Sequence, residues 1–342
     1  MVYEKIVLVT RKTRLEGLVE RFNTRSQARF YLEQSDVHQQ SRAQPPAAAP
    51  PRGGQRSAGG KPQSPASAPS SFALYEREHE TYHAALNALR ERLQKLTKLH
   101  LIERSFLPNY VFAENDLVVT IGIDGLVVNT AKYLSGQPLI AVNPDPAHID
   151  GVLLPFNVAQ AGEVAARALK GQFSVREIRM AEARLNDGQV LRAFNDLFVG
   201  VNSHISARYH LRFQAREEDQ SSSGIIISTG VGATGWLSSL FNMADQLWAG
   251  FGSANVPLPR PALDWESDRL VFVVREPFIS KTSTARVVCG IITPDEPLLI
   301  ESQMPDRGVI FSDGVEADFL AFNAGGSARI GLAEQKTRFV IG

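Results

Sequence analysis

The sequence predicts an α/β domain built on a Rossmann-like parallel sheet, followed by a mostly antiparallel, sandwich-like β domain. The length of 342 residues is enough for two domains that each bury a core. Strand-like apolar runs alternate with helical segments in the first half, whereas short strands separated by turn residues fill the second half. We place the first domain at residues 1–156 and the second at 157–320. We expect residues 321–342 to pack back on the first domain.

The first domain begins with the apolar run Lys5–Thr10, which has the length and continuous hydrophobicity of a buried parallel strand. A polar, arginine-rich segment follows, and we expect a helix over residues 25–33. Residues 41–71 then carry prolines at 45, 46, 50, 51, 62, 65 and 69 among alanine, glycine and serine. Such a segment cannot bury enough apolar surface to offset its chain entropy. We therefore predict a disordered surface insertion inside the first domain.

A long helix is predicted over residues 75–102. Tyr82, Leu86, Leu89, Leu93 and Leu96 recur at alternating spacings of four and three, with charged residues between them. That stripe fits either a coiled-coil seam or a helix packed on a sheet, and its shortness favours the sheet. Next come a buried strand over residues 116–121, a helix over 125–135 and a third strand over 138–142. A strand, a tight glycine turn, a helix and a strand in succession indicate a βαβ unit and a parallel sheet.

The second domain begins after a short helix, which we expect over residues 158–170. Polar and apolar residues alternate over 175–184, as in a strand with one face in solvent. Further strands are predicted at 198–201, 207–213, 224–228, 269–274, 286–289 and 297–300. Asp313-Gly314 is typical of a hairpin turn near the end of this domain.

Composition narrows the possible partners. Hydrophobic residues make up 44% of the chain and charged residues 21%, as in an ordinary soluble globular protein. Lysine plus arginine equals aspartate plus glutamate at 36 each, so no overall field favours nucleic acid or an anionic membrane. The N-terminal residues lack a basic segment followed by a long apolar one, and no apolar run reaches the ~18 residues of a membrane helix. We expect a cytoplasmic protein without a membrane or nucleic-acid partner.

The single cysteine, Cys289, excludes an internal disulfide and a cysteine-based zinc cluster. It lies in the apolar run at 286–290, so we predict a buried and inert thiol.

The first segment whose residues could carry out chemistry is the turn at residues 122–126, Gly-Ile-Asp-Gly-Leu. It lies between a buried strand and a helix. Free amides at a helix N-terminus, approached closely through glycines, bind phosphate. Asp124 in this turn can orient or deprotonate a hydroxyl that attacks a phosphoryl group, or hold magnesium. By physics alone, an aspartate at such a position is more often a helix N-cap. No Gly-Lys-Ser/Thr follows, so this is not a Walker A loop.

Two further segments lie in the second domain. Gly230, Gly232 and Gly235 satisfy G-x-G-x-x-G between a strand and a helix that we expect over 237–247. However, no acidic residue lies about twenty positions on, and the surrounding elements look antiparallel, so this match to the Rossmann fingerprint is weak. The pair Asn195-Asp196 leads into an apolar strand, and taken alone it is typical of an Asx turn.

Taken together and in order, these segments resemble those of the NAD kinases. The resemblance is closest to the mitochondrial-type branch and spans nearly the whole chain. It rests on the segments at 75–79 (YEREH), 141–146 (AVNPDP) with Gly151, 192–196 (RAFND), 222–224 (SSG), 228–236 (STGVGATGW) and 274–277 (VREP).

The resemblance implies phosphoryl transfer from ATP or polyphosphate to the 2′-hydroxyl of the adenosine ribose of NAD, which gives NADP. Mg²⁺ would accompany the triphosphate without a dedicated protein cage, so no residue is assigned as a metal ligand. Relatives are commonly oligomeric, so a homodimer is implied. By position, Asp124 would be the general base. The residues implied to bind the phosphates of ATP are Gly122, Ile123, Gly125 and Leu126, and those implied to bind NAD are Asn143, Asn195, Asp196, Thr229, Gly230, Gly232, Ala233, Thr234 and Trp236.

The turn departs from the family's usual Gly-Gly-Asp-Gly-Thr, because Ile123 replaces the second glycine and Leu126 replaces the threonine. If that glycine needs a positive φ, isoleucine costs on the order of 1–3 kcal/mol. Loss of the threonine hydroxyl removes a phosphate donor worth roughly 1.5–3 kcal/mol. Ala233 likewise stands where a serine is usual. The motif is therefore a degenerate version of the family's pattern.

The sequence leaves two alternatives to an active kinase. The first is a divergent, catalytically weak NAD(P)-binding or regulatory protein of the same fold. The second is an NAD-dependent oxidoreductase based on G-x-G-x-x-G, for which the sequence provides no paired histidine–acid constellation.

Overall fold

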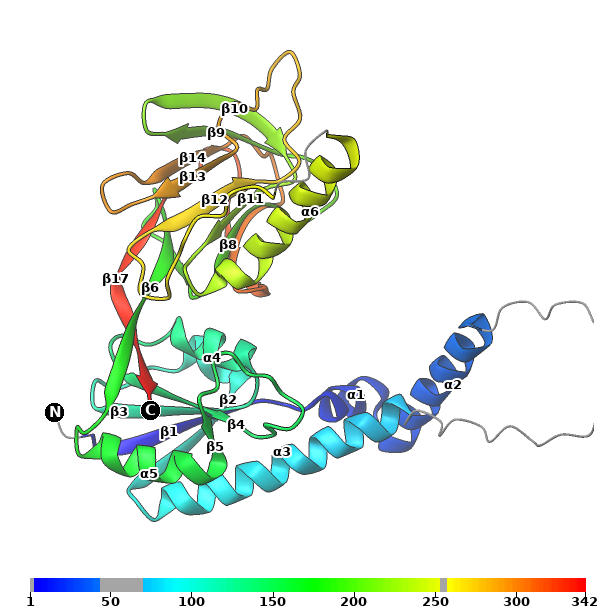
Figure 1. Ribbon diagram of the computed structural model, residues 1–342, viewed down its shortest axis with the longest axis vertical. Coiled ribbons are helices and arrows are strands. Elements are labelled where there is room, and N and C mark those ends of the chain that lie inside the picture. Colours follow the sequence, from blue (N-terminus) through cyan, green and yellow to red (C-terminus); the bar gives the residue numbers. More distant parts are fainter. Residues whose placement is uncertain (1–2, 44–69, 253–256) are drawn as a thin grey trace, which may run out of the picture.

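Short apolar strands pair side by side in parallel at the core of the first domain. They are β1 (Lys5–Thr10), β2 (Lys98–Glu103), β3 (Asp116–Ile121) and β4 (Pro138–Asn143), in the order β2-β1-β3-β4. The short β5 (Phe156–Asn157) pairs in parallel with the last two residues of β4. Every residue of β3 and β4 is buried, which explains their continuous apolar sequence. The structure is a computed structural model that describes residues 3–43, 70–252 and 257–342 (Figure 1).

Helices cover both faces of this parallel sheet. On one face, α3 (Ser71–Gln94) and α5 (Val158–Leu169) bury Tyr82, Leu89, Leu93 and Val164 against the strands. On the other face, α4 (Asp124–Ala131) packs between the sheet and the second domain (Figure 1). The leucine stripe of α3 is therefore the contact of a helix with a sheet rather than a coiled-coil seam.

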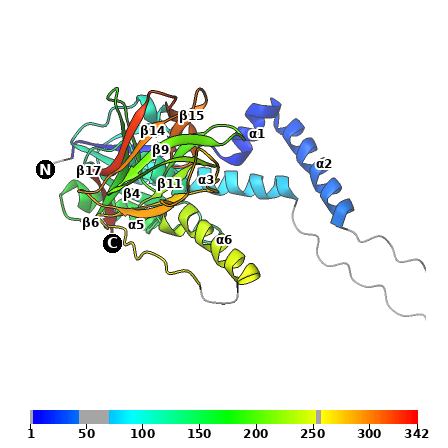
Figure 2. The same cartoon turned by 90° about the horizontal axis from the view of Figure 1, so that it is seen from above.

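A small hydrophobic cluster attaches the two N-terminal helices to α3. α1 (Arg14–Phe22) and α2 (Arg25–Ala43) pack beside the first turns of α3 through Leu15, Ala28 and Phe72 (Figures 1 and 2). α1 was not predicted from the sequence. Residues 41–43 end α2 rather than starting an insertion, and most of the predicted insertion, residues 44–69, lies outside the described residues.

The predicted helix over 75–102 is wrong at its C-terminal end. α3 stops at Gln94, and residues 98–103 form β2, which pairs with β1 along its whole length. β2 is an edge strand in which only Ile102 is buried, so no continuous apolar run marks it. Leu96 continues the helical spacing by coincidence, and pairing with β1 overrides it.

The second domain is a sandwich of two sheets. One layer contains β8 (Asp196–Val201), β11 (Ile225–Ser228), β12 (Leu270–Val274), β13 (Cys289–Ile292), β15 (Gly308–Ser312) and β16 (Val315–Ala321). The other contains β7 (Val190–Ala193), β9 (Ala207–Phe213), β10 (Arg216–Ser222) and β14 (Leu298–Ser302). Their inward side chains, among them Leu211, Ile227, Phe272 and Ile300, form one core. α6 (Trp236–Phe251) packs on the outer face of the first layer.

Two long strands run through both domains. β6 (Ser174–Leu185) pairs with β17 (Ser327–Ile341) along almost its whole length, as Figure 1 shows. β17 pairs with β14 in the second domain and, at Arg338 and Phe339, in parallel with β4 in the first. One mixed sheet thus continues between the domains, and the predicted class of α/β plus β is confirmed.

Individual predictions in the second domain have mixed outcomes. The hairpin turn at Asp313-Gly314 is confirmed, because both residues have the positive φ of a tight hairpin, 55° and 68°. The strand predicted at 286–289 instead begins at Cys289, and the thiol predicted to be buried is exposed. The reason is that β13 is an edge strand whose Cys289 side chain lies away from the sandwich core. Within the described residues, no helix is long and apolar enough to cross a membrane.

Candidate functional site

The turn at residues 122–124 lies at the carboxyl end of β3, where an open parallel sheet binds ligands. The Gly122 N–H donates to the carbonyl oxygen of Val142 at 3.1 Å, which fixes the turn to β4. A Cβ atom on Gly122 would lie 3.0 Å from a methyl carbon of Leu126 and 3.3 Å from Cδ of Arg11. Glycine here therefore allows the Arg11 side chain to lie across the turn.

Ile123 carries none of the strain that the sequence analysis considered. Its backbone is extended, with φ −108° and ψ 166°, a conformation that any residue adopts. The next altered residue, Leu126, has its side chain in the hydrophobic core, and its N–H donates to the Ile123 carbonyl oxygen at 2.9 Å. Neither substitution distorts the turn.

Asp124 is the first residue of α4 and is not its cap. The N-cap position belongs to Ile123, which has no side-chain oxygen, so the N-cap interpretation of Asp124 is wrong. Its carboxylate instead accepts from the N–H groups of Val152 at 3.2 Å and Leu153 at 3.0 Å. The first N–H groups of α4, at Asp124 and Gly125, have no partner within the helix because an α-helix leaves its first donors free.

Asn143, at the end of the neighbouring strand, holds the same loop from its other side. Its amide donates to the Ile149 carbonyl oxygen at 2.9 Å, and its side-chain oxygen accepts from the Asp145 N–H at 2.9 Å. Gly151 has a φ of +60°, and a Cβ there would lie 2.8 Å from Leu154 and 3.0 Å from the Asn143 amide nitrogen. Asp124 and Asn143 together fix the loop that follows β4.

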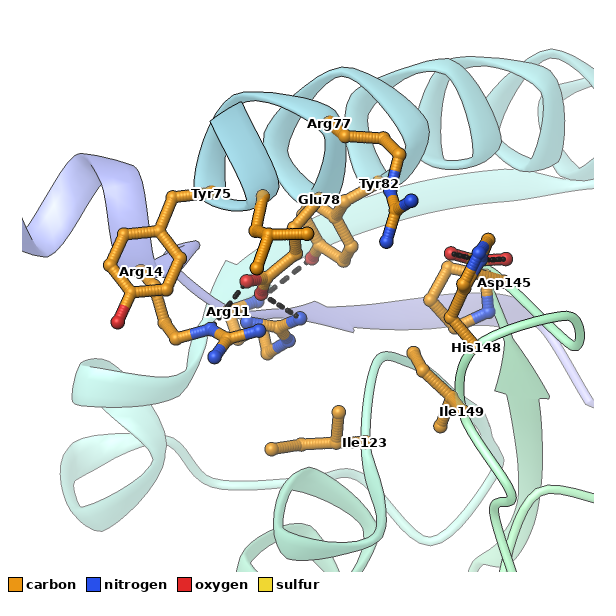
Figure 3. Close-up of a pocket in the computed structure, with 12 residues that line it drawn as sticks. Arg11, Arg14, Tyr75, Arg77, Glu78, Tyr82, Ile123, Asp145, His148 and Ile149 are labelled. Carbon is orange, nitrogen blue, oxygen red and sulfur yellow. Dashed lines mark hydrogen bonds and ion pairs between the residues drawn. The ribbon is translucent and has the colours of Figure 1, made fainter. Parts of the chain in front are cut away.

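A pocket of about 370 Å³ opens beside this turn, between α3 and the ends of the parallel strands (Figure 3). Its three arginines, Arg11, Arg14 and Arg77, outnumber its two carboxylates, Glu78 and Asp145. The remaining lining residues are Leu74, Tyr75, Tyr82, Ile123, Pro144, His148 and Ile149. The charge balance favours an anionic ligand.

Side chains of α3 hold Arg11 and Arg14 in place. Glu78 accepts from Arg11 at 2.9 Å and also pairs with Arg14, as Figure 3 shows. The Arg11 guanidinium lies 5.0 Å from the centre of the Tyr82 ring, and the Tyr82 hydroxyl accepts from the Arg11 backbone N–H at 3.0 Å. Arg11 Nε is buried and has no hydrogen-bond partner among the described residues. Arg11 thus lines the pocket with a guanidinium held in one position, a group that suits an acceptor-rich ligand such as phosphate.

Several residues of this pocket were not predicted from the sequence. They are its three arginines and, in addition, Glu78 and His148. Arg11 directly follows the first strand, and that position at a strand's carboxyl end was a usable signal. Arg77 and Glu78 lie within residues 75–79, a segment noted only as part of a resemblance. His148 contacts the Asp145 carboxylate at 2.9 Å in the loop after β4. These residues meet only because α1, α3 and that loop converge.

A second group of predicted residues meets at the start of β8. The Thr229 N–H donates to the Asn195 carbonyl oxygen at 2.9 Å, and the Gly232 N–H donates to the Thr229 hydroxyl at 3.2 Å. A Cβ on Gly232 would lie 2.4 Å from the Asn195 carbonyl oxygen, and one on Gly230 only 1.8 Å from that of Asp264. These glycines therefore allow close backbone packing. β11, which leads into them, is antiparallel to both of its neighbours, unlike the parallel βαβ unit of a Rossmann fingerprint.

Asp313 anchors this second group from the hairpin turn. Its carboxylate accepts from the N–H groups of Phe194 at 3.0 Å, Asn195 at 2.7 Å and Asp196 at 3.2 Å. Burial raises the pKa of Asp313 to about 6, although these N–H groups and the charge of Lys132 oppose the shift. No motif in the sequence indicated that the hairpin turn would contact Asn195-Asp196.

Asp196 and Asn195 each bury a polar atom without a partner. Oδ1 of both side chains has no hydrogen bond within the described part of the chain. Burial raises the pKa of Asp196 to about 7, the nearby charge of Asp313 adds to the shift, and the Ser228 hydroxyl opposes it. Buried polar atoms without partners are rare in folded proteins and often mark ligand sites.

The two groups face the same helix. Phe194 and Val231 of the second domain share a hydrophobic cluster with Leu126 and Val127 of α4. Trp236 is not part of this contact, because its indole stacks on Phe198, with ring centres 5.8 Å apart, on the outer face of the second domain. Ala233 is half-buried and Thr234 exposed in the turn before α6. The structure thus gathers Asp124, Asn143, Asn195 and Asp196 around α4 and the adjoining loops.

Replacing Asp196 with asparagine is expected to flatten the pH dependence of stability. A carboxyl whose pKa is raised on folding contributes stability that is fully present below its ordinary pKa near 3.9 and is lost as the pH rises through about 7. Between pH 5 and 8 the variant should lose roughly 2–3 kcal/mol less unfolding free energy than the wild type. Urea denaturation at both pH values measures this difference.

The matched control is Asp187→Asn. Hydrogen bonds from Gln189 lower the pKa of Asp187, so it titrates below the range tested. This control should follow the wild type between pH 5 and 8. An Asp196→Asn variant that also followed the wild type would contradict the assigned shift.

Comparison with known proteins points to one family. No family model matches the chain. It is 26% identical to the NAD kinase of Saccharolobus solfataricus over 127 residues, which cover 37% of this chain and 49% of that protein. It is also 26% identical to the NAD kinase of Geobacter sp. strain M21 over 238 residues, or 65% and 71% of the two chains. The chain therefore spans about half the length of the first of these relatives.

Solved structures give the same indication for the fold. An NAD kinase from Archaeoglobus fulgidus in complex with ATP superposes with a TM-score of 0.52 at 15% identity, covering 75% of this chain and 89% of that one. A yeast NADH kinase complexed with NADH superposes with a TM-score of 0.53 at 14% identity, covering 77% and 80%. The chain has the fold of these proteins, and the sequence similarities support the NAD kinase family.

Proposed function

We propose that this protein is a phosphotransferase of the NAD kinase type, which transfers a phosphoryl group from ATP or polyphosphate to the adenosine-ribose 2′-hydroxyl of NAD. The observation that carries the proposal is the position of Asp124 in a turn whose Ile123 lines an arginine-rich pocket. We further propose the mitochondrial-type branch, a cytoplasmic location and a homodimer, as the sequence analysis expects.

The pocket suits the phosphates of the donor. Arg11, Arg14 and Arg77 offset the negative charge of a polyphosphate chain, and the free amides at the start of α4 add donors. Asp145, a carboxylate that lines the pocket, supplies the oxygen ligand that Mg²⁺ prefers, so it would hold the ion that enters with the phosphates. Mg²⁺, when bound, neutralises charge on the transferred group.

The chemical step assigns a role to Asp124. In phosphoryl transfer a carboxylate accepts the proton of the attacking hydroxyl as that oxygen bonds to phosphorus. The N–H groups of Val152 and Leu153 fix the Asp124 carboxylate in one orientation. A carboxylate that is already oriented loses little entropy when the hydroxyl arrives, which supports the general-base role.

The acceptor side of the proposal rests on Asn195 and Asp196. Their partnerless Oδ1 atoms are acceptors that match the O–H donors of a ribose. Residues 229–234, which pack against this pair, would line the dinucleotide site. Trp236 is then a more distant wall, since its ring stacks on Phe198.

The second candidate is a dinucleotide-binding protein with little transferase activity. It is favoured by one observation, the Leu126 side chain, which lies in the core where the family's threonine would offer a hydroxyl to phosphate. The oxidoreductase alternative has no comparable support, because the strand before G-x-G-x-x-G is antiparallel to its neighbours.

A coupled assay separates these candidates. The purified protein is incubated with NAD, Mg²⁺ and either ATP or polyphosphate, and NADP is detected with an NADP-specific dehydrogenase. The proposed kinase forms NADP with at least one donor. Binding of NAD by calorimetry without NADP formation, in a folded sample and with every donor, would establish the second candidate instead.

Replacing Arg14 with glutamine is expected to raise the KM for the phosphoryl donor by roughly 10- to 100-fold, because a charge-assisted contact worth roughly 1.5–3 kcal/mol is removed. The KM for NAD should stay within about 2-fold of the wild-type value. Arg14 is 63% exposed, so folding should be little affected. Steady-state kinetics with each substrate varied in turn measure both constants.

Arg25→Gln is the matched control. Arg25, the first residue of α2, pairs with Glu76 of α3 but does not line the pocket. Its removal should leave both constants unchanged. An equal rise in the donor KM for both variants would show that the effect comes from helix packing rather than from phosphate binding.

A further inference from the structure

Three metal-ligating side chains meet outside the pocket, between α1 and α3. They are Glu16, His79 and His83, and one ligand atom from each lies within 4.8 Å of the other two. All three are half-buried, so an ion can reach them while the helices exclude part of the solvent. Nothing in the proposed phosphoryl transfer uses them.

The helices place these side chains together. His79 and His83 are four residues apart on α3 and therefore point from one face of the helix. Their rings lie 4.4 Å apart, with an angle of 60° between the planes. Glu16, in the first turn of α1, faces them with its carboxylate.

The distances are close to those of a metal site. His83 Nε2 lies 3.1 Å from Glu16 Oε1. In a tetrahedral zinc site, a nitrogen and an oxygen each about 2.0–2.2 Å from the ion are roughly 3.3–3.5 Å apart. This pair needs only a few tenths of an ångström of adjustment, and rotation of the His79 side chain brings in the third ligand.

A fourth oxygen lies beside the same group. The Thr13 hydroxyl is 2.9 Å from His79 Nδ1 and 3.1 Å from Glu16 Oε2. It can position a water molecule as the remaining ligand or fix the imidazole orientation from outside the coordination sphere. Glu16 uses Oε2 in the capping box of α1, where it accepts from the Thr13 N–H at 2.7 Å, and this leaves Oε1 for an ion.

Hydrogen bonding alone accounts for only part of this arrangement. The capping box requires Thr13 and Glu16, and a single histidine would complete the contact with Oε1. It does not require a second imidazole 4.4 Å from the first. Two imidazoles and one carboxylate are a ligand set that divalent transition metals prefer and that Mg²⁺ and Ca²⁺ do not.

We propose that Glu16, His79 and His83 form a binding site for one Zn²⁺ ion, with water completing the coordination. The bound ion joins the first turn of α1 to α3. Arg14 follows Thr13 in the chain, and Glu78 precedes His79, so the ion also fixes two residues of the neighbouring pocket. The test of this site contains no nucleotide, so its outcome does not depend on whether the protein makes NADP.

Calorimetry on the full chain, freed of tags and treated with a chelator, tests the site with ZnCl₂ alone. One ion should bind per chain, and Co²⁺ should give the visible absorption of a four- or five-coordinate site. His83→Gln and His79→Gln should each weaken Zn²⁺ binding by about 100-fold or more, since each removes one of three ligands. His210→Gln should bind as the wild type does, because His210 pairs with Asp219 in the second domain.

Thermal unfolding without metal checks that each variant folds. Zn²⁺ should raise the melting temperature of the wild type and of His210→Gln, but not that of His83→Gln. The proposal is overturned if the chelated wild type binds no Zn²⁺ at micromolar concentrations. It is equally overturned if His83→Gln, folded by its melting curve, binds Zn²⁺ as tightly as the wild type.

Discussion

Replacing Asp124 with asparagine is expected to lower kcat for NADP formation by roughly 10²–10⁴-fold, the contribution of a positioned general base. Asparagine keeps one acceptor oxygen for the N–H groups of Val152 and Leu153, so the loop after β4 should hold its place. NAD binding should therefore change by less than about 3-fold. The coupled assay gives kcat, and calorimetry gives the affinity for NAD.

A second substitution separates catalysis from loop anchoring. Asp124→Ala removes both acceptors, so it should lose the activity and in addition loosen the loop, seen as faster amide exchange at residues 152 and 153. If Asp124 only anchored the loop, the asparagine variant would keep most of its activity and only the alanine variant would fail. Asp150→Asn, at an exposed position in the same loop, should behave as the wild type.

Replacing Asp313 with alanine is expected to lower the free energy of unfolding by about 3–5 kcal/mol. The change leaves the N–H groups of Phe194, Asn195 and Asp196 without their acceptor, and each unsatisfied buried donor costs roughly 1–3 kcal/mol. Asp313 also has a φ of 55°, which alanine tolerates less well than aspartate. Urea denaturation at pH 7.5 measures the loss.

Asp313→Asn should cost less than the alanine variant, because asparagine tolerates the same φ and keeps one acceptor oxygen. Asp306→Ala, at an exposed loop position, is the control and should stay within about 0.5 kcal/mol of the wild type. A loss below about 1 kcal/mol in Asp313→Ala would contradict the anchoring role. In a variant that still folds at 10 °C, NAD binding should weaken as well, since Asn195 and Asp196 lose their support.

The sequence was most informative where a feature is local. β3 and β4 are buried on both faces, so they appear as uninterrupted apolar runs, and each strand end marks a residue of the site, Asp124 and Asn143. The same reasoning failed for β2 and for Cys289, because edge strands need no apolar signature. β10 is almost wholly polar and exists as a strand through its pairing with β9.

Part of the site was predicted from the order of several motifs along the chain rather than from any single motif. Alone, Asn195-Asp196 is a common turn and Asp124 a common first residue of a helix. Their order along the chain indicated a family. Solved structures that are only 14–15% identical to this chain now show that it has the fold of that family. The prediction of backbone strain at Ile123 was wrong, because a residue's φ depends on how the turn packs.

By itself, the sequence determined the two-domain class, the buried strands and the residues at their carboxyl ends, because period and apolar content are set by neighbours in the chain. The tertiary structure alone decided the contacts between distant segments. Arg11 meets Glu78 across 67 residues, and Asp313 holds Phe194 across 119. Such pairs depend on how helices and hairpins dock, and docking is set by the whole core rather than by any one segment.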